Sequence, residues 1–194
     1  MILPIVAYGD PVLRKMGKEI DQDYPNLKEL IANMKETMYN ASGVGLAAPQ
    51  IGKAIRLFVI DASPFAEDDN LEEEEKATLK NFVRVYINPK ILNEEGEEWT
   101  FNEGCLSIPD VREDVTRKSK VTLAYQDEDF TTQTEVLDGL AARVFQHEYD
   151  HIEGVLFTDK VSSLKKRLIK RKLENISKGK IRADYRMRFP NLKK

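Results

Sequence analysis

The segment Gly139–Ile152 has the sequence GLAARVFQHEYDHI, with the pattern His-Glu-Tyr-Asp-His at positions 147–151. In an α-helix, residues four positions apart lie one turn apart on the same face, so the imidazoles of His147 and His151 can bind one metal ion. Glu148 lies beside that face, where its carboxylate can accept a proton from a metal-bound water. The segment therefore predicts a helix that carries a metal site.

This five-residue pattern also arises by chance, so the alternative interpretation is that both histidines are simply buried in the core. The two histidines of the pattern are the only ones in the chain. Leu140 and Val144 continue the same face and make it apolar, and each unpaired polar group in apolar surroundings carries a desolvation cost. A metal site is therefore the stronger interpretation.

A catalytic site of this kind needs a third protein ligand. The candidate is Cys105, the only cysteine, within the sequence Glu-Gly-Cys-Leu-Ser at 103–107. Its alternative role is that of a small buried apolar residue, although the neighbouring Gly104 favours a turn here. A thiolate with two neutral imidazoles favours Fe(II) or Zn(II) over Mg(II) or Ca(II) and leaves a coordination position open.

The sequence GVGLAAPQ at residues 43–50 is the third motif. Its glycines permit close approach of the backbone to another group, with a helix-to-strand turn as the alternative interpretation. The motif lacks the Lys-Ser/Thr ending of a phosphate-binding loop. Gln50 ends it with a neutral amide that can donate a hydrogen bond to a developing oxyanion.

Hydrophobic periodicity predicts one helix before these motifs and one after them. The first spans residues 26–40. The second has a basic face and an apolar stripe made of Leu164, Leu168, Ile169, Leu173 and Ile176. Strands are predicted at residues 55–60, 82–87 (ended by Asn88-Pro89), 120–125 and 132–137. Mixed strands between helices, without βαβ regularity, predict an α+β fold.

Length and composition limit the possible classes of protein. The chain has 194 residues, 41% of them hydrophobic, which favours a single folded domain over residues 1–194. One cysteine excludes an intrachain disulfide framework and favours a reducing compartment. No stretch approaches the ~18 apolar residues of a membrane span, and the first residues do not resemble a signal peptide.

The net charge of −3 conceals an uneven distribution. Residues 1–159 carry 16 basic and 31 acidic side chains, whereas residues 160–194 carry 14 basic and 2 acidic ones. We interpret the acidic residues 64–80 as a surface insertion, and residues 160–194 as a basic helical C-terminal extension. A basic helix of this kind is usually a solvated face.

Together the three motifs resemble those of the peptide deformylase family. Residues 43–50 resemble its glycine-rich motif ending in glutamine, residues 103–107 its cysteine motif, and residues 146–154 its metal-binding helix. The opening at residues 2–14 is also similar to the usual opening of the family. The resemblance covers nearly the whole chain except residues 64–80 and the far C-terminus, and the helical ending resembles the branch with a C-terminal helix.

The resemblance implies β-sheets around a central metal-binding helix. It also implies an enzyme that removes the N-formyl group from the formyl-methionine of newly made polypeptides and releases formate. Its cofactor would be one divalent metal ion, generally Fe(II), with Zn(II), Ni(II) or Co(II) able to substitute. The metal ligands would be Cys105, His147 and His151.

The resemblance also implies roles for residues around the metal. A metal-bound water would attack the formyl carbon with Glu148 as general base, while Gln50 and the backbone N–H of Leu106 would hold the oxyanion. The residues whose backbone would line the peptide-binding cleft are Val44, Gly45 and Gly104. The candidates for an apolar pocket around the methionine side chain are Leu46, Leu140 and Val144.

Expected partners are N-formyl-methionyl nascent peptides and, through the basic residues 160–194, the ribosome, because RNA phosphates attract basic side chains. Neither DNA nor a membrane is an expected partner, and the expected location is a bacterial-type cytoplasm.

Two alternatives of other classes stay open on the sequence. An ordinary His-Glu-x-x-His metalloprotease usually takes a third His or Glu downstream, whereas this chain has no third histidine and Cys105 lies upstream. A non-catalytic metal-binding or nucleic-acid-binding module would use the basic tail instead. Metal content and formate release from a formyl-Met peptide separate these interpretations.

Overall fold

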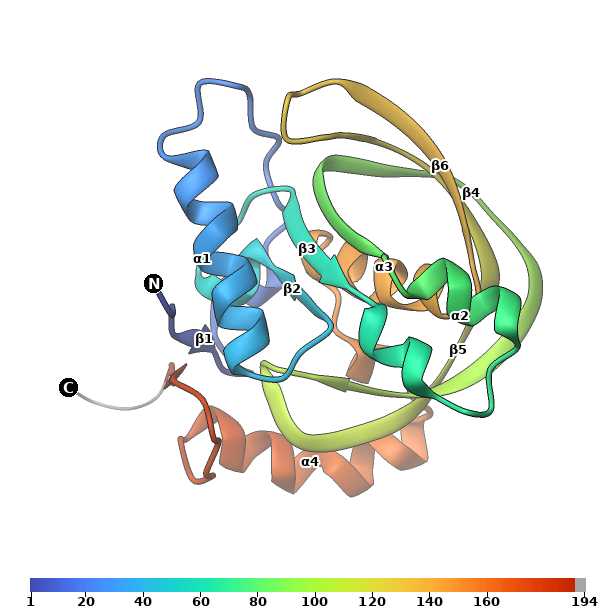
Figure 1. Cartoon of the computed structure of the whole chain (residues 1–194). Coiled ribbons are helices and arrows are strands. Elements are labelled where there is room, and N and C mark those ends of the chain that lie inside the picture. Colours follow the sequence, from blue (N-terminus) through green and yellow to red (C-terminus); the bar gives the residue numbers. More distant parts are fainter. Residues whose placement is uncertain (191–194) are drawn as a thin grey trace.

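A computed structural model describes residues 1–190 and confirms the predicted α+β class (Figure 1). Helix α3 (Gly139–Ile152), which has the predicted bounds, packs against a curved five-stranded antiparallel sheet in the order β2-β3-β4-β5-β6. The strands are β2 (Gly45–Ala47), β3 (Leu57–Asp61), β4 (Val83–Cys105), β5 (Ile108–Gln126) and β6 (Thr132–Asp138). Short 3₁₀ turns occur at Pro11–Arg14, Ala48–Ile51, Ser63–Glu67 and Phe157–Asp159.

The long strands β4 and β5 form a hairpin that brings Cys105 to the metal helix. The predicted end of a strand at Asn88-Pro89 is wrong, because β4 continues to Cys105. Asn88 has a left-handed φ of 49°, and the pairing of β4 with β5 shifts register at this point. Such an irregularity admits Pro89, which has no N–H to donate, without ending the strand.

Helix α1 (Leu27–Asn40) confirms the predicted helix over residues 26–40. Its buried apolar side chains are those at helical spacing: Leu27, Leu30, Ile31, Met34 and Met38. They pack with Leu46 and Leu57 in a core cluster that covers one side of β2 and β3. The glycine-rich motif at residues 43–50 leaves this helix and is thereby held at the start of the sheet.

An aromatic cluster fixes α3 against the other side of the sheet. The ring of Phe145 lies 5.4 Å from that of Phe58 on β3 and 5.0 Å from that of Tyr86 on β4, measured between centroids. Aromatic pairs of this kind stabilise by ~0.5–1.5 kcal/mol beyond the area they bury. This packing positions the helix face that carries the two histidines.

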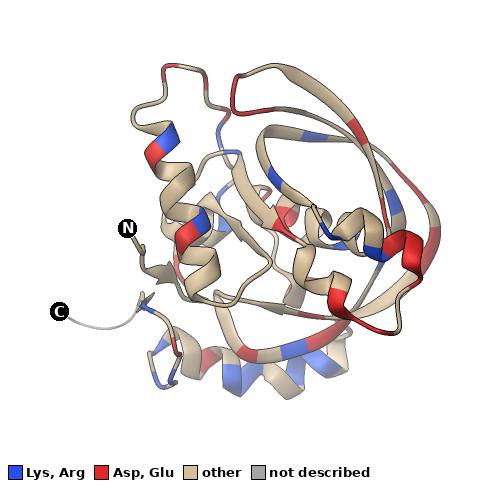
Figure 2. Ribbon diagram, in the orientation of Figure 1, with Lys and Arg blue, Asp and Glu red and all other residues tan. Residues whose placement is uncertain are grey.

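Residues 64–80 contribute to the support of α3. They include helix α2 (Glu73–Leu79), whose Leu79 is buried in the core. The Glu75 carboxylate accepts a hydrogen bond of 3.0 Å from the N–H of Leu140, one of the free donors in the first turn of α3. Figure 2 shows the acidic side of this segment. That it is an insertion within a single domain stays a prediction.

Helix α4 (Ser163–Ser177) confirms a C-terminal helix, and basic residues predominate along it (Figure 2). The predicted helical extension over residues 160–194 is too long, because residues 178–190 continue as turns and a short strand. Its buried apolar side chains are Ile169, Leu173 and Ile176. Leu164 and Leu168, also predicted in the apolar stripe, are 66% and 71% exposed. The helical rotation of about 100° per residue turns these two away from Ile169, so the predicted stripe is wrong for them.

The first and last strands of the described chain pair with each other. Strand β1 (Ile5–Val6) pairs in parallel with β7 (Met187–Arg188). Residues 191–194 of the predicted basic extension lie outside the described residues. Within residues 1–190, no helix combines the length and the apolar character needed to cross a membrane.

Two leucines of α4 test this assignment of its faces. We expect Leu173→Ala to lower the free energy of unfolding by about 2–3 kcal/mol, because it leaves a cavity in the core. Leu168→Ala, which removes the same atoms from an exposed position, should change it by less than about 0.5 kcal/mol. Denaturant unfolding of both variants measures the difference, and equal losses would contradict the assignment.

Candidate metal centre and active site

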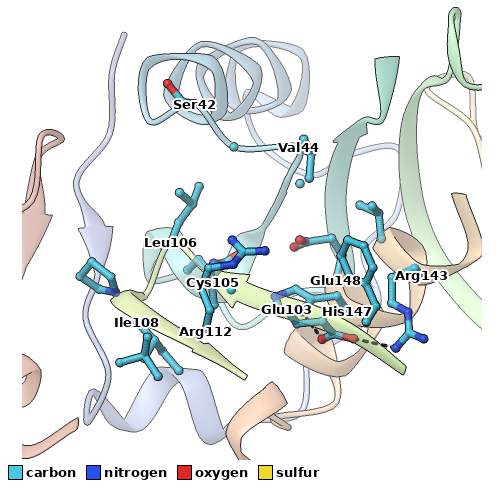
Figure 3. A pocket seen from close by; sticks show the side chains of 18 of the residues that line it. Ser42, Val44, Glu103, Cys105, Leu106, Ile108, Arg112, Arg143, His147 and Glu148 are labelled. Atoms are coloured by element: carbon cyan, nitrogen blue, oxygen red, sulfur yellow. Dashed lines mark hydrogen bonds and ion pairs between the residues drawn. The ribbon is translucent and has the colours of Figure 1, made fainter. Parts of the chain in front are cut away.

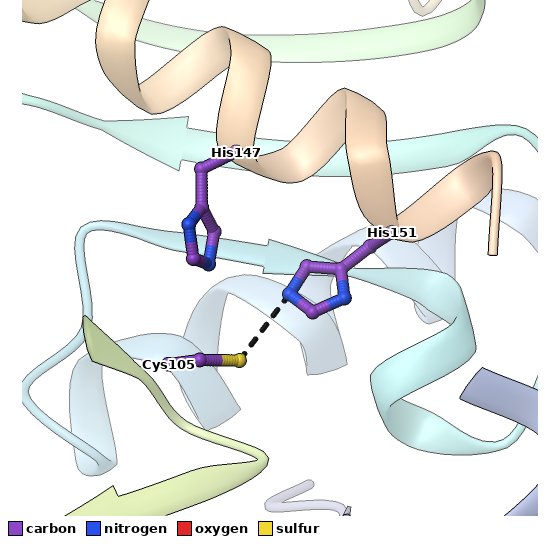
Figure 4. Close-up of side chains that lie close together, drawn as sticks. All are labelled: Cys105, His147 and His151. Atoms are coloured by element: carbon purple, nitrogen blue, oxygen red, sulfur yellow. Dashed lines mark hydrogen bonds between the residues drawn. The ribbon is translucent and has the colours of Figure 1, made fainter. Parts of the chain in front are cut away.

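Cys105, His147 and His151 converge on one point (Figure 4). Their ligand atoms all lie within 4.8 Å of one another, and Cys105 Sγ lies 3.3 Å from His151 Nε2. Ligands of one tetrahedral ion lie roughly 3.5 Å apart, so small side-chain shifts bring these three atoms to bonding distance. A thiolate with two imidazoles suits a transition metal with an open coordination position. The structure therefore brings the three predicted ligands together in an arrangement that could hold a metal ion.

Local structure explains why the three ligands meet. The two imidazoles project from adjacent turns of α3, with ring centroids 5.1 Å apart. Cys105 is the last residue of β4, and the tight turn at Leu106 and Ser107 brings the chain into β5. The helix and the hairpin thus present their ligands from opposite sides.

A buried carboxylate, that of Glu103, orients the first histidine (Figure 3). His147 Nδ1–H donates to Glu103 Oε2 at 2.9 Å, which leaves Nε2 for the metal. Arg117 holds the same carboxylate with two hydrogen bonds of 2.7 and 2.9 Å, and Arg143 adds one of 3.0 Å. Burial alone would raise the pKa of Glu103, but the hydrogen bonds from Arg117 and His147 lower it well below its usual range. Glu103 is therefore a permanent negative charge behind the ligand.

Burial and neighbouring groups also shift the pKa values of the two imidazoles. Burial and the nearby positive charge of His147 lower the pKa of His151 well below its usual value, which favours the neutral form that binds metals. Burial would also lower the pKa of His147, but hydrogen bonds with Cys105 and Glu103 raise it well above. A metal ion bound by Cys105 and His147 would release the proton that lies between these two groups.

Glu148 is buried beside the metal ligands and points into the cavity (Figure 3). Its Oε2 has no hydrogen-bond partner within the described residues. Burial raises the pKa of Glu148 to about 7. A methyl group on Gly45 would lie 2.3 Å from Glu148 Oε1, so any larger residue would displace this carboxylate. The close approach inferred for the glycine-rich motif is therefore present.

Gln50 is buried, and its amide has a defined orientation. Its Oε1 accepts a hydrogen bond of 2.8 Å from the N–H of Ala47. The Nε2 group consequently faces the site, 3.5 Å from Cys105 Sγ and 3.4 Å from Ser107 Oγ. This orientation makes Gln50 a hydrogen-bond donor beside the metal ligands.

A cavity of about 450 Å³ opens over the metal ligands. The residues predicted for the site that line it are Val44, Gly45, Gln50, Gly104, Cys105, Leu106, Val144, His147 and Glu148. Leu46 and Leu140, predicted for its apolar pocket, do not line it and are corrected. Alternation along β2 turns Leu46 to the α1 side of the sheet, and Leu140 packs in the core one turn before Val144.

Sequence reasoning missed two aromatic contributors to the cavity wall. Phe101 on β4 and Phe65, from the acidic residues 64–80, line it and face each other edge to face at 6.3 Å. Arg143 also lines it, with its guanidinium carbon 4.3 Å from the ring centre of Trp99. An aromatic residue within an otherwise acidic stretch was the available signal for Phe65.

Comparisons with known proteins agree with this geometry. Residues 2–167 match the family described as polypeptide deformylase. The chain is 69% identical over its full length to a peptide deformylase of Flavobacterium johnsoniae, covering 99% of that protein. It is similar to the crystal structure of peptide deformylase from Thermotoga maritima, with a TM-score of 0.72, 40% identity, and coverage of 84% of this chain and 99% of that one. For Arabidopsis thaliana peptide deformylase 1B the TM-score is 0.77 at 36% identity, covering 92% of each chain.

Glu103 provides a test of the metal centre that does not touch the ligands. We expect Glu103→Gln to weaken metal affinity by about 10- to 100-fold, because the ligand His147 loses its charged partner. Competition with a chelator measures this, and the unfolding midpoint reports on the fold. Glu98→Gln, at an exposed position on the same strand, is the control and should bind metal normally. Equal affinities of the two variants would contradict the role of Glu103.

Proposed function

Because the chain belongs to the polypeptide deformylase family and is a peptide deformylase, we propose that it removes the N-formyl group from formyl-methionyl nascent polypeptides and releases formate. One observation carries this proposal: the sulfur of Cys105 and two imidazoles meet below a cavity, beside the carboxylate of Glu148, whose Oε2 has no hydrogen-bond partner within the described residues. We also propose a bacterial-type cytoplasm as its location, because nascent chains emerge there and a reducing compartment keeps Cys105 as a thiol.

Cys105, His147 and His151 would hold the metal, for which we propose Fe(II), with Zn(II), Ni(II) or Co(II) able to substitute. The mixed thiolate and imidazole donors support a transition metal of this kind. When bound, the metal supplies a Lewis acid that lowers the pKa of water toward ~7 and polarises the formyl oxygen.

The other residues around the metal have separate roles in the reaction. Glu148 accepts a proton from the water that attacks the formyl carbon and delivers it to the amine nitrogen as the C–N bond breaks. Gln50 Nε2 and the backbone N–H of Leu106 donate hydrogen bonds to the oxyanion that develops on the formyl oxygen. Water and the formamide are thereby converted into formate and a protonated amine.

The cavity walls would bind the first residue and the peptide that follows it. The side chains of Val44, Phe65, Phe101 and Val144 make one part of the cavity apolar, which suits an unbranched methionine side chain. The backbones of Gly45 and Gly104 lie at the edge of the same cavity, where an extended peptide can form hydrogen bonds with them.

Replacement of Glu148 tests its role as the general base and acid. The metal-loaded protein should release formate from a formyl-Met tripeptide. Glu148→Gln should lower kcat by about 10²- to 10⁴-fold, because general acid–base catalysis is lost while the shape of the side chain stays. Metal content should remain one ion per chain. Metal-loaded protein that leaves the peptide intact would overturn the proposed function, and an active Glu148→Gln variant would overturn the role of this residue.

We further propose that the exposed basic face of α4 binds the ribosome, whose RNA presents phosphates. Arg167 and Arg171 are exposed, lie four positions apart on this helix, and flank the exposed Leu168. Their spacing places both charges on one solvent-facing surface, where they can contact phosphates together.

Charge reversal tests this surface without removing the buried side of the helix. The Arg167→Glu/Arg171→Glu variant should bind ribosomes more weakly. Its affinity should also depend less on salt, because about one to two fewer ions are released on binding. Lys28→Glu/Lys53→Glu, with the same change in net charge at exposed positions elsewhere, is the control. Sedimentation with ribosomes at several salt concentrations measures both, and unchanged binding of the α4 variant would contradict the proposal.

A further inference from the structure

After α4 the chain turns back and pairs with strand β1, close to the active site. It runs alongside β1, where the N–H of Ile5 donates to the carbonyl of Arg186 and that of Ala7 to the carbonyl of Arg188, both at 2.9 Å. In Figure 1 this segment lies beside β1 at the end of the coloured chain. Residues 168–190 lie beyond the part matched to the family model.

Tyr185, just before β7, makes the contact with the site. Its hydroxyl donates a hydrogen bond of 2.7 Å to the carbonyl of Leu106, 79 positions earlier in the sequence. Its ring packs, partly buried, against the core cluster that Leu106 also contacts. Burial raises the pKa of Tyr185, so the hydroxyl stays protonated and remains a donor at neutral pH.

The turn that Tyr185 contacts is held from several directions. The carbonyl of Ser107 accepts a hydrogen bond of 2.8 Å from the N–H of Tyr8, next to β1. Ser107 is fully buried, and Gln50 Nε2 lies 3.4 Å from its hydroxyl. On the other side of the turn, Cys105 is fixed by its strand and by the metal centre.

We propose that Tyr185 is a positioning residue for deformylation, which holds the Leu106–Ser107 peptide so that the Leu106 N–H points at the reacting formyl oxygen. With Cys105 fixed before the turn and the Leu106 carbonyl fixed after it, both backbone dihedral angles of Leu106 are restricted. Its N–H donates to no protein acceptor within residues 1–190 and is therefore free for the oxyanion. The proposal rests on the role proposed above for Leu106.

Tyr185→Phe tests the positioning role, because it removes only the hydroxyl oxygen and keeps the ring and its packing. We expect kcat for a formyl-Met tripeptide to fall by about tenfold, less than the ~100-fold that loss of an oxyanion donor typically costs. KM, metal content and the unfolding midpoint should stay close to those of the parent protein. Amide hydrogen exchange at Leu106 and Ser107 should become faster, because the turn loses a restraint.

Tyr39→Phe is the matched control. It also removes a tyrosine hydroxyl, which donates to a carboxylate oxygen of Asp61 at 2.8 Å, and neither residue lines the cavity, so it should leave kcat unchanged. A Tyr185→Phe variant with parental kcat, or one in which kcat falls only together with metal content and stability, would overturn the proposal. If the parent protein itself released no formate, the proposed function would fail as well, so the two failures are distinguishable.

Discussion

The buried carboxylate of Glu103 is the interaction on which the metal centre depends. It connects strand β4 to β5 through Arg117 and to α3 through Arg143 and His147. Arg117 continues the network to Asp150 at 2.7 Å, so two carboxylates face the two arginines. Removal of one member of such a network leaves an uncompensated buried charge, which typically costs ~3–5 kcal/mol. The same carboxylate thus joins the helix to the sheet and sets the orientation of a metal ligand.

The rest of the site is arranged around this connection by backbone constraints. Gly45 lets β2 pass directly over Glu148, and the Gln50 amide is held by the backbone N–H of Ala47. The hairpin turn after Cys105 is held by groups from both ends of the described chain, Tyr8 and Tyr185. Catalytic groups supported in this way need little reorganisation during the reaction, which is the main physical advantage of a preorganised site.

Much of this arrangement was predictable from particular residues. The bounds of α3 and the pairing of His147 with His151 follow from helical periodicity, which is a local property. The predictions that were wrong also have local physical causes. Leu46 was assigned to the cavity although β2 has only three residues, too few for alternation to reveal its face. Leu164 and Leu168 were placed on the buried stripe because basic residues surround both the buried and the exposed leucines of α4.

Spacing along the chain was therefore sufficient for the two histidines of α3 and for the helices, because contacts between residues a few positions apart repeat with a fixed period. Cys105 became the candidate third ligand for another reason, since it is the only cysteine of the chain. The fold was needed to bring Phe65 into the cavity wall, to surround Glu103 with two arginines and to bring Tyr185 to Leu106. These contacts join residues from 14 to 79 positions apart. No periodicity links such residues, and their meeting depends on how the sheet curves around α3 and where the two ends of the chain pair.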